Sequence, residues 1–139
     1  MSAKDLMTGS VAAWNRRDRA AYLAVYAEDC TLTSPDGSGK GHDAVGAFFD
    51  ASLRAFPDNR VRVDALAEDG ELLVEEGVLT GTNTGPLPLP DGTDGPATGA
   101  AMELPYAAVH VLRDGRIVDS RYYWDQMAML GQLGLLPSQ

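Results

Sequence analysis

The chain has 139 residues, of which 45% are hydrophobic, and its 20 acidic and 11 basic residues give a formal net charge of −9. This length and apolar content suit one domain with one core, spanning residues 1–139. Nucleic acids and anionic lipid surfaces require clustered Lys and Arg, so we expect neither a nucleic acid nor a membrane as partner. A neutral or cationic small molecule, or another protein, remains.

The compartment is inferred from three further features. No run of about 18 or more apolar residues without charge predicts a membrane span. The N-terminal residues lack the basic start and long apolar stretch of a secretory signal. The one cysteine, Cys30, cannot form a disulfide within the chain. We therefore expect a cytoplasmic protein.

Two helices are predicted at the start of the chain. Ser2 followed by Asp5 resembles a capping box, and apolar residues at helical spacing predict a helix over residues 3–15. Asp18 is predicted to cap a second helix over residues 19–28.

A short strand, residues 30–34, is predicted next, followed by a turn-rich segment, "PDGSGKGH". Asp43 is predicted to begin a third helix with an apolar face, and Pro57 to end it.

Beyond residue 60 the hydrophobic period changes from helical to alternating. Val61, Val63 and Ala65 are predicted to point inward, and Asp69-Gly70 predicts a hairpin to a return strand. Residues 83–99 are rich in Gly, Pro and Thr and are predicted to form a long loop between strands.

The last part of the chain contains two strands and a helix. The stretch "AMELPYAAVHVLRDG" predicts a long strand in which Pro105 implies an edge or a bulge. The stretch "IVDSRYYW" is the last strand, and Gln126 to Gly134 form a closing helix. The fold class is therefore α+β, with a curved antiparallel sheet that wraps around helices as a cone open at one end. Such a cone encloses a cavity lined by apolar and aromatic side chains.

Asp125 is the first candidate catalytic residue, because it stands between the aromatic end of the last strand and the closing helix. One interpretation is a structural N-cap of that helix. The other is a carboxylate in the cavity, where burial beside aromatic rings would raise its pKa and let it carry a proton near neutral pH. Both interpretations can hold at a strand end.

Two further titratable residues are candidates. His110 shares strand parity with Leu104, Tyr106 and Ala108, so it is either a core residue or a second proton carrier that faces the cavity. Of the adjacent pair Glu75 and Glu76, only one can face inward. Glu76 is the preferred choice because it alternates with apolar residues, but a surface role remains open.

Aromatic side chains are more numerous than plain packing requires, and some are expected to contact the ligand. The expected substrate contacts are Trp14, Tyr26, Phe49, Tyr106 and Tyr123. No His/Cys/Asp cluster has metal-ligand spacing, so no metal is expected.

The order of these elements resembles the nuclear-transport-factor-2-like superfamily, and within it the SnoaL-like polyketide cyclase group. The stretches that carry the resemblance are "AWNRRD", "YLAVYAEDCTLTSPDG", "GHDAVGAFF", "GTNTG" and "HVLRDGRIVDSRYYWDQMAMLGQLG". They lie within residues 10–136, and the strand–Asp–helix segment ending in "QLG" is the most specific.

The resemblance implies a cone-shaped α+β barrel, a homodimer, and chemistry without a metal or an organic cofactor. Asp125 matches the aspartate that serves as general acid/base in SnoaL-like cyclases. Asn83 stands where relatives often have histidine, so proton transfer there is lost while hydrogen bonding to a substrate remains possible.

The sequence therefore predicts a cofactor-free acid/base enzyme that acts on a hydrophobic small molecule, with aldol cyclisation of a polyketide-type substrate as its reaction. Asp125 would move the proton, and His110 or a tyrosine would stabilise the oxyanion. Epoxide hydrolysis or epoxide-opening cyclisation by Asp125 with Glu76 is an alternative. A module that binds a small ligand without catalysis is another, because fold alone does not fix function.

Overall fold

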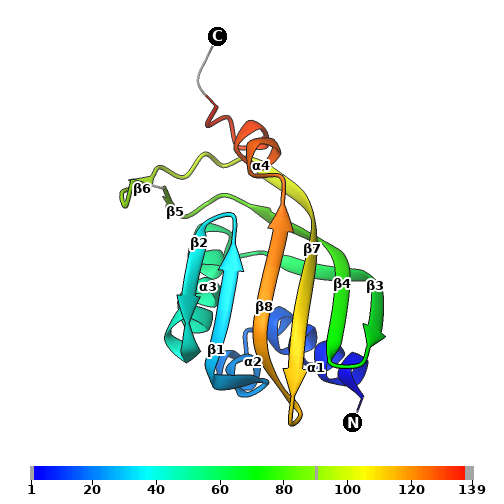
Figure 1. Ribbon diagram of the computed structural model, residues 1–139. Helices are drawn as coiled ribbons and strands as arrows, with labels where there is room; N and C mark the ends of the chain where they lie inside the picture. Colours follow the sequence, from blue (N-terminus) through cyan, green and yellow to red (C-terminus); the bar gives the residue numbers. More distant parts are fainter. Residues whose placement is uncertain (1, 90, 137–139) are drawn as a thin grey trace.

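The computed structural model describes residues 2–89 and 91–136, and its main feature is a curved sheet with helices on one face (Figure 1). In chain order the elements of the first half are α1 (Ala3–Asn15), α2 (Arg19–Ala24), β1 (Tyr26–Ser34), β2 (Gly37–Lys40) and α3 (Gly41–Ala55). Those of the second half are β3 (Arg60–Asp69), β4 (Leu72–Thr82), β5 (Leu87–Pro88), β6 (Asp94–Gly95), β7 (Ala101–Arg113), β8 (Arg116–Trp124) and α4 (Gln126–Gln132).

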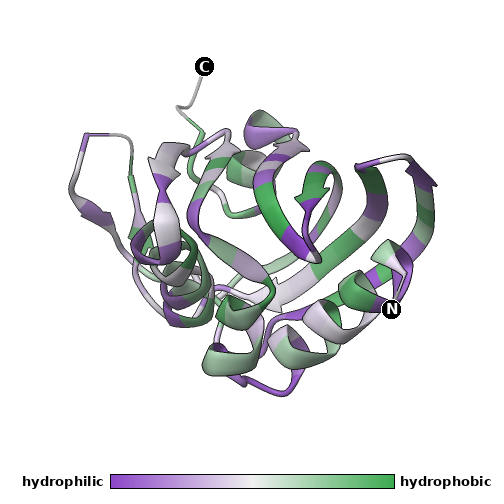
Figure 2. Cartoon of the chain, turned by 60° about the horizontal axis from the view of Figure 1, so that its bottom comes forward, coloured by the Kyte–Doolittle hydropathy of each residue, from purple (hydrophilic) through white to green (hydrophobic). Residues whose placement is uncertain are grey.

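The main sheet has the strand order β2-β1-β8-β7-β4-β3 and curls around the helices (Figure 2). All neighbouring strands are antiparallel except β1 and β8, which are parallel. The α+β class and the curved sheet are confirmed. The expectation of a wholly antiparallel sheet was wrong at this one pair, because β1 enters the sheet after two helices and not through a hairpin.

The starts of the first two helices are as predicted. Ser2 Oγ accepts a hydrogen bond from the Asp5 amide at 3.1 Å, and the Asp5 carboxylate accepts one from the Ser2 amide at 3.4 Å. The Asp18 carboxylate accepts one from the Ala21 amide at 3.1 Å. Each capping group therefore satisfies backbone donors that have no partner inside the helix.

The region around Tyr26 differs from the prediction, because α2 ends at Ala24 and not at residue 28. The Ile117 amide donates to the Val25 carbonyl at 2.9 Å, and Tyr26 pairs with Ile117 in the parallel ladder. Tyr26 is 1% exposed. The burial and sheet pairing of this segment thus outweigh its tendency to continue the helix.

Two other local predictions need correction. The turn-rich segment after Ser34 contains strand β2, which pairs with β1. In β3 the register shifts between Val63 and Ala65, so Val61, Val63 and then Leu66 are less exposed than their neighbours, and Ala65 is exposed. A bulge of this kind adds one residue and reverses the parity that follows it.

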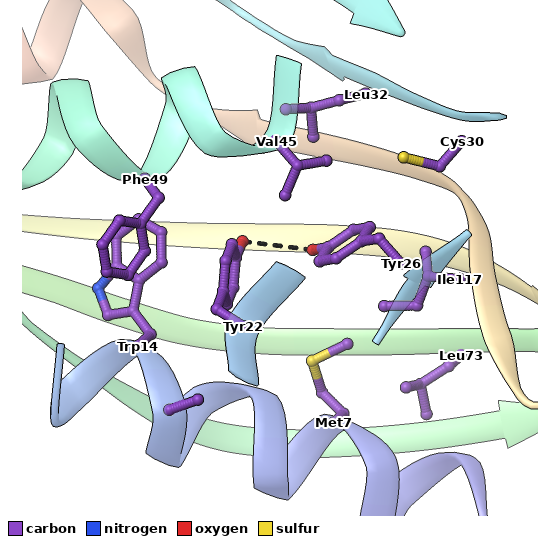
Figure 3. Packing of buried hydrophobic residues seen from close by; sticks show 11 residues of the cluster. Met7, Trp14, Tyr22, Tyr26, Cys30, Leu32, Val45, Phe49, Leu73 and Ile117 are labelled. Carbon is purple, nitrogen blue, oxygen red and sulfur yellow. Dashed lines mark hydrogen bonds between the residues drawn. The ribbon is translucent and has the colours of Figure 1, made fainter. Parts of the chain in front are cut away.

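Most of the core lies between the helices and the concave face of the sheet. Its largest cluster joins side chains of α1, α2 and α3 to those of β1, β4 and β8, including Met7, Tyr22, Val45, Leu73 and Ile117 (Figure 3). A second cluster lies between the end of α3, β7 and α4. None of the helices in the described part of the chain combines the length and apolar character needed to cross a bilayer.

Candidate active site

A cavity of about 480 Å³ lies between the helices and the concave face of the sheet. Its volume is within the range of about 300–1,000 Å³ that is usual for small-molecule sites. Seven aromatic side chains contribute to its wall: Trp14, Tyr22, Phe48, Phe56, Tyr106, Tyr122 and Trp124. Two carboxylates also line it, Glu75 and Asp36.

Glu75 is the buried carboxylate of this cavity, with an exposed fraction of 2%. Leu73, Glu75 and Gly77 form the inner face of β4, whereas Glu76 points outward and is exposed. The choice of Glu76 as the inward carboxylate was therefore wrong. Leu72 and Val74, which guided that choice, lie on the outer face and are 42% and 40% exposed.

Glu75 is held by hydrogen bonds from both sides. His110 Nε2 lies 2.6 Å from Glu75 Oε1, and the Tyr106 hydroxyl donates to Oε2 at 2.8 Å. His110 Nδ1 lies 2.6 Å from Ser120 Oγ. When Glu75 is ionised its carboxylate can only accept, and Nε2 of His110 then carries the proton that points at it. The network therefore runs from Ser120 through His110 to a carboxylate at the cavity wall.

Three adjacent strands position this network. Tyr106 and His110 lie on the inner face of β7, and Ser120 of β8 is paired with His110. Both His110 and Ser120 are fully buried. The predicted inward parity of His110 is thus confirmed, but His110 lies behind Glu75 and is not among the residues that line the cavity. Any direct contact of His110 with a ligand is therefore excluded in this arrangement.

Gly77 explains how Tyr106 can reach Glu75. Gly77 is the cross-strand partner of Tyr106. A Cβ atom at Gly77 would lie 2.9 Å from the Tyr106 hydroxyl and 2.4 Å from the Arg62 carbonyl oxygen. The absence of a side chain at Gly77 thus leaves room for the Tyr106 phenol to extend over β4 to Glu75.

Among the other tyrosines near Glu75, Tyr22 and Tyr26 are buried and Tyr122 is half-buried. The hydroxyls of Tyr22 and Tyr26 lie 3.3 Å apart (Figure 3). Burial raises the pKa of Tyr22 and of Tyr122 well above the ordinary value. Because Tyr22 and Tyr122 line the cavity and keep their protons, they are available as neutral hydrogen-bond donors to a bound oxygen.

The aromatic rings form a continuous wall. The ring of Phe48 lies 5.8 Å from that of Trp14, 5.2 Å from that of Tyr122 and 6.4 Å from that of Trp124, centroid to centroid. Tyr122 in turn lies 6.1 Å from Tyr106. A flat or polycyclic ligand could therefore contact ring faces along the length of the cavity.

The predicted substrate contacts are partly corrected. Trp14 and Tyr106 line the cavity as expected. Tyr26 and Phe49 are buried in the core, and the cavity-lining positions are those of Tyr22 and Phe48 instead.

Tyr123 is also displaced from its predicted place, since it lies on the outer face of β8 and is 56% exposed. Its neighbours Tyr122 and Trp124 line the cavity. Alternation along the strand decides this, because a run of three aromatic residues must send the middle one to the other face.

Asp125 caps α4 and does not line the cavity. Its Oδ1 accepts a hydrogen bond from the Ala128 amide at 2.9 Å, and the residue is exposed. The N-cap interpretation is confirmed. The expectation of a desolvated carboxylate in the cavity was wrong, because the chain turns outward at the end of β8 to begin the helix.

Asn83 is fully buried, and its side chain bonds to the surrounding chain. Its Nδ2 donates to the Ala55 carbonyl at 3.1 Å and to the Gly85 carbonyl at 2.9 Å. Its Oδ1 accepts from the Thr98 amide at 2.9 Å and from the Thr98 hydroxyl at 3.0 Å. Asn83 thus joins both ends of the segment between β4 and β7 to the end of α3, and it is not among the residues that line the cavity.

Sequence reasoning missed Ser120 and Asp36 and ranked Glu75 below its neighbour. Ser120, Tyr122 and Trp124 alternate along β8, so strand parity alone could have placed Ser120 beside His110. Asp36 lies in a Pro-Asp-Gly turn, and nothing in that turn signal indicates a cavity.

Comparisons with known proteins agree with this fold. The family model for the SnoaL-like domain matches residues 7–120. Comparison with curated protein sequences gave no match.

Many solved structures share the fold, and three of them illustrate the likeness. AclR, a proposed hydroxylase from Streptomyces galilaeus, has a TM-score of 0.81 and 25% identity over 97% of this chain and 86% of its own. An NTF2-like protein of unknown function from Burkholderia pseudomallei has a TM-score of 0.79 and 26% identity over 96% and 98%. A proposed polyketide cyclase from Pseudomonas putida has a TM-score of 0.77 and 25% identity over 95% and 98%.

Proposed function

The chain belongs to the SnoaL-like domain family, and from this premise we propose that it is a cofactor-free acid/base enzyme acting on a hydrophobic small molecule in its internal cavity. The observation that carries the proposal is the carboxylate of Glu75 at the cavity wall, hydrogen-bonded by His110 and Tyr106. Convergence of several titratable groups on one buried point favours catalysis over simple binding.

The proposed step is proton removal from a carbon next to a carbonyl group. Glu75 would take the proton, and the electron pair of the broken C–H bond would form an enolate. A hydroxyl of Tyr22 or Tyr122 would donate a hydrogen bond to the enolate oxygen. His110 does not touch the ligand, so its role is to position Glu75.

For the overall reaction we propose an intramolecular aldol cyclisation of a polyketide-type substrate. The enolate carbon would attack a second carbonyl carbon of the same molecule, forming the new C–C bond. The resulting alkoxide would recover the proton held on Glu75, so no other reactant is consumed. The aromatic wall would fold the chain into the required geometry, and the solved structure named as a proposed polyketide cyclase supports this choice.

The epoxide route that paired Asp125 with Glu76 has no geometric basis. Both residues are exposed and neither lines the cavity. Binding without catalysis is the remaining rival, and the following experiment separates it from the proposal.

The test follows enolisation and ring closure separately. Exchange of the α-hydrogens of 2-tetralone in D2O, followed by proton NMR, should be accelerated by the wild type. Ring closure of an aryl-substituted 1,5-diketone should be accelerated as well. Glu75→Gln keeps the side-chain shape and should lower both rates about 10²-fold or more.

Glu76→Gln is the matched control, because it makes the same chemical change one residue away on the outer face. If wild type and Glu75→Gln gave equal rates of exchange and ring closure while circular dichroism showed both to be folded, acid/base catalysis by Glu75 would be excluded. The binding module would then be the remaining hypothesis. Exchange without ring closure would retain the acid/base function and remove the cyclase assignment.

We also propose a homodimer formed through the outer face of the sheet. Helices α1, α2 and α3 lie on one face of the sheet (Figure 1). Leu72, Val74 and Tyr123 expose 42%, 40% and 56% of their surfaces on the outer face. Exposed apolar patches of this kind mark interaction surfaces, and a second copy presents a surface of the same chemistry. Light scattering should give the dimer mass for the wild type and the monomer mass for Val74→Lys, and a monomeric wild type would contradict the dimer.

A further inference from the structure

Asp36 is the second carboxylate of the cavity, and no step of the proposed reaction uses it. It lies in the turn between β1 and β2, where its amide donates to Ser34 Oγ at 3.1 Å. It lines the cavity but is exposed, in contrast to the buried Glu75. Asp36 therefore marks the place where the cavity meets solvent, and Glu75 lies deeper.

A short chain of hydrogen bonds links Asp36 to an aromatic ring. Gln126 Nε2 donates to Asp36 Oδ1 at 3.2 Å, and Trp124 Nε1 donates to Gln126 Oε1 at 2.6 Å. The amide of Gln126 thus fixes the Trp124 ring relative to the carboxylate. The Phe48 ring lies 6.4 Å from Trp124, with an angle of 33° between the planes. The Trp124 ring, which is linked to this carboxylate through Gln126, and the neighbouring Phe48 ring both line the cavity.

The ionisable side chains with a net charge in the described cavity lining are all acidic. The described lining contains Asp36 and Glu75 but no Lys, Arg or His. Glu75 already receives hydrogen bonds from His110 and Tyr106, whereas Asp36 receives one from the neutral amide of Gln126. Although Asp36 as a residue is exposed, partial desolvation raises the pKa of its carboxyl, and the Gln126 bond opposes that shift. A cation beside Asp36 would supply the missing opposite charge.

We propose that the mouth of the cavity binds an organic ammonium group, with its charge facing Asp36 and its alkyl groups packed on Trp124 and Phe48. Ring faces attract cations through their quadrupole, and a carboxylate adds a direct charge partner. The substrate class is then a hydrophobic molecule that carries a tertiary or quaternary amine. That this molecule is a substrate rests on the proposed function, whereas the binding site rests on its geometry alone.

The test compares two ligands of one shape. Benzyltrimethylammonium carries the charge, and neopentylbenzene is its neutral isostere. Binding is measured by quenching of tryptophan fluorescence, because both tryptophans, Trp14 and Trp124, line the cavity. We expect the cation to bind wild type at least about tenfold more tightly than the isostere, and Asp36→Asn to reduce this advantage to threefold or less. Asn at this position can still accept the hydrogen bond from Gln126.

Glu68→Gln serves as the control for long-range charge, because it removes one negative charge from an exposed position on β3 outside the cavity lining. Its preference for the cation should match that of the wild type. Equal binding of the two ligands by wild type, no binding of either, or a preference unchanged in Asp36→Asn would each overturn the proposal.

Glu75→Gln separates this proposal from the proposed function. That variant should lose α-hydrogen exchange and keep its preference for the cation, whereas Asp36→Asn should lose the preference. If Glu75→Gln, and not Asp36→Asn, abolished the preference, the cation would belong at the inner end and the mouth site would be refuted.

Discussion

Glu75 and His110 are diagonal neighbours on β4 and β7, and Glu75 Oε1 lies 2.6 Å from His110 Nε2. Leu73 is the partner of His110 in the ladder, and Ala108 is the partner of Glu75. Both side chains are removed from water, with exposed fractions of 2% and 0%. The hydrogen bond between the two groups therefore offsets much of the free-energy cost of removing each of them from water. Loss of either member should destabilise the fold.

Replacement of His110 should reveal this dependence. His110→Leu leaves the Glu75 carboxylate buried with Tyr106 as its remaining donor, and breaking a buried pair in this way costs about 3–5 kcal/mol. We expect the free energy of unfolding in urea to fall by that amount. His110→Gln can still donate to Glu75 and should recover part of it.

A double-mutant cycle supplies the control. Loss of His110 should cost much less in the Glu75→Gln background, because the neutral amide needs no charge partner. Equal losses in the two backgrounds would show that the pair is not coupled.

Alkaline pH should unfold the protein as its buried tyrosines ionise. Burial raises the pKa values of Tyr22, Tyr26, Tyr106 and Tyr122 above the ordinary value, which is about 10. In the unfolded chain these groups lose their protons near pH 10, whereas in the folded chain they retain them. The unfolded state then binds fewer protons, so stability is full below about pH 10 and decreases as the pH rises above it.

Absorbance at 295 nm measures tyrosine ionisation, and far-UV circular dichroism measures unfolding in the same pH titration. We expect the tyrosinate signal of these four residues to appear with the loss of secondary structure. Full ionisation of all five tyrosines near pH 10 with the circular dichroism spectrum unchanged would contradict the burial described above.

Asn83→Ala should destabilise the protein without touching the cavity. The change removes four hydrogen bonds and leaves the buried Ala55 carbonyl, and partly buried backbone groups of Gly85 and Thr98, without those partners. At about 1 kcal/mol per bond, the loss should be roughly 2–4 kcal/mol in the free energy of unfolding. Thr84→Ala, at an exposed neighbouring position, is the control and should change stability by less than about 0.5 kcal/mol.

Asp125→Ala should behave as the loss of a helix cap. We expect a decrease in stability of about 1 kcal/mol, because the Ala128 amide loses its acceptor. Exchange of 2-tetralone hydrogens should stay within a few-fold of the wild-type rate. A fall of 10²-fold or more at unchanged stability would instead favour the catalytic role that the family resemblance implied for Asp125.

The features that the sequence predicted well are set by local chemistry. Ser2 with Asp5, and Asp18, mark helix starts because their side chains bond to backbone groups only a few residues away. The inward parity of Tyr106 and His110 follows from simple alternation in a strand with apolar neighbours. Signals of this kind need no knowledge of the rest of the chain.

The features that the sequence did not predict depend on the other layers of the molecule. Both faces of β4 carry apolar residues, so alternation could not separate Glu75 from Glu76, and only the position of the helices decides between them. Tyr26 reads as helical until its parallel pairing with β8 is known. Asp125 was assigned by likeness to a motif, and the motif fits a cap as well as a catalyst.

The pairing of β4 with β7 runs without a shift from Leu72 opposite Val111 to Thr82 opposite Ala101. Glu75 belongs to one of these strands, and Tyr106 and His110 belong to the other. A slip of a single residue in either strand would turn the groups of that strand to the other face and separate Glu75 from Tyr106 and His110. The arrangement of the proton-handling groups therefore depends on the pairing of β4 with β7. It should persist under any condition in which these two strands stay paired.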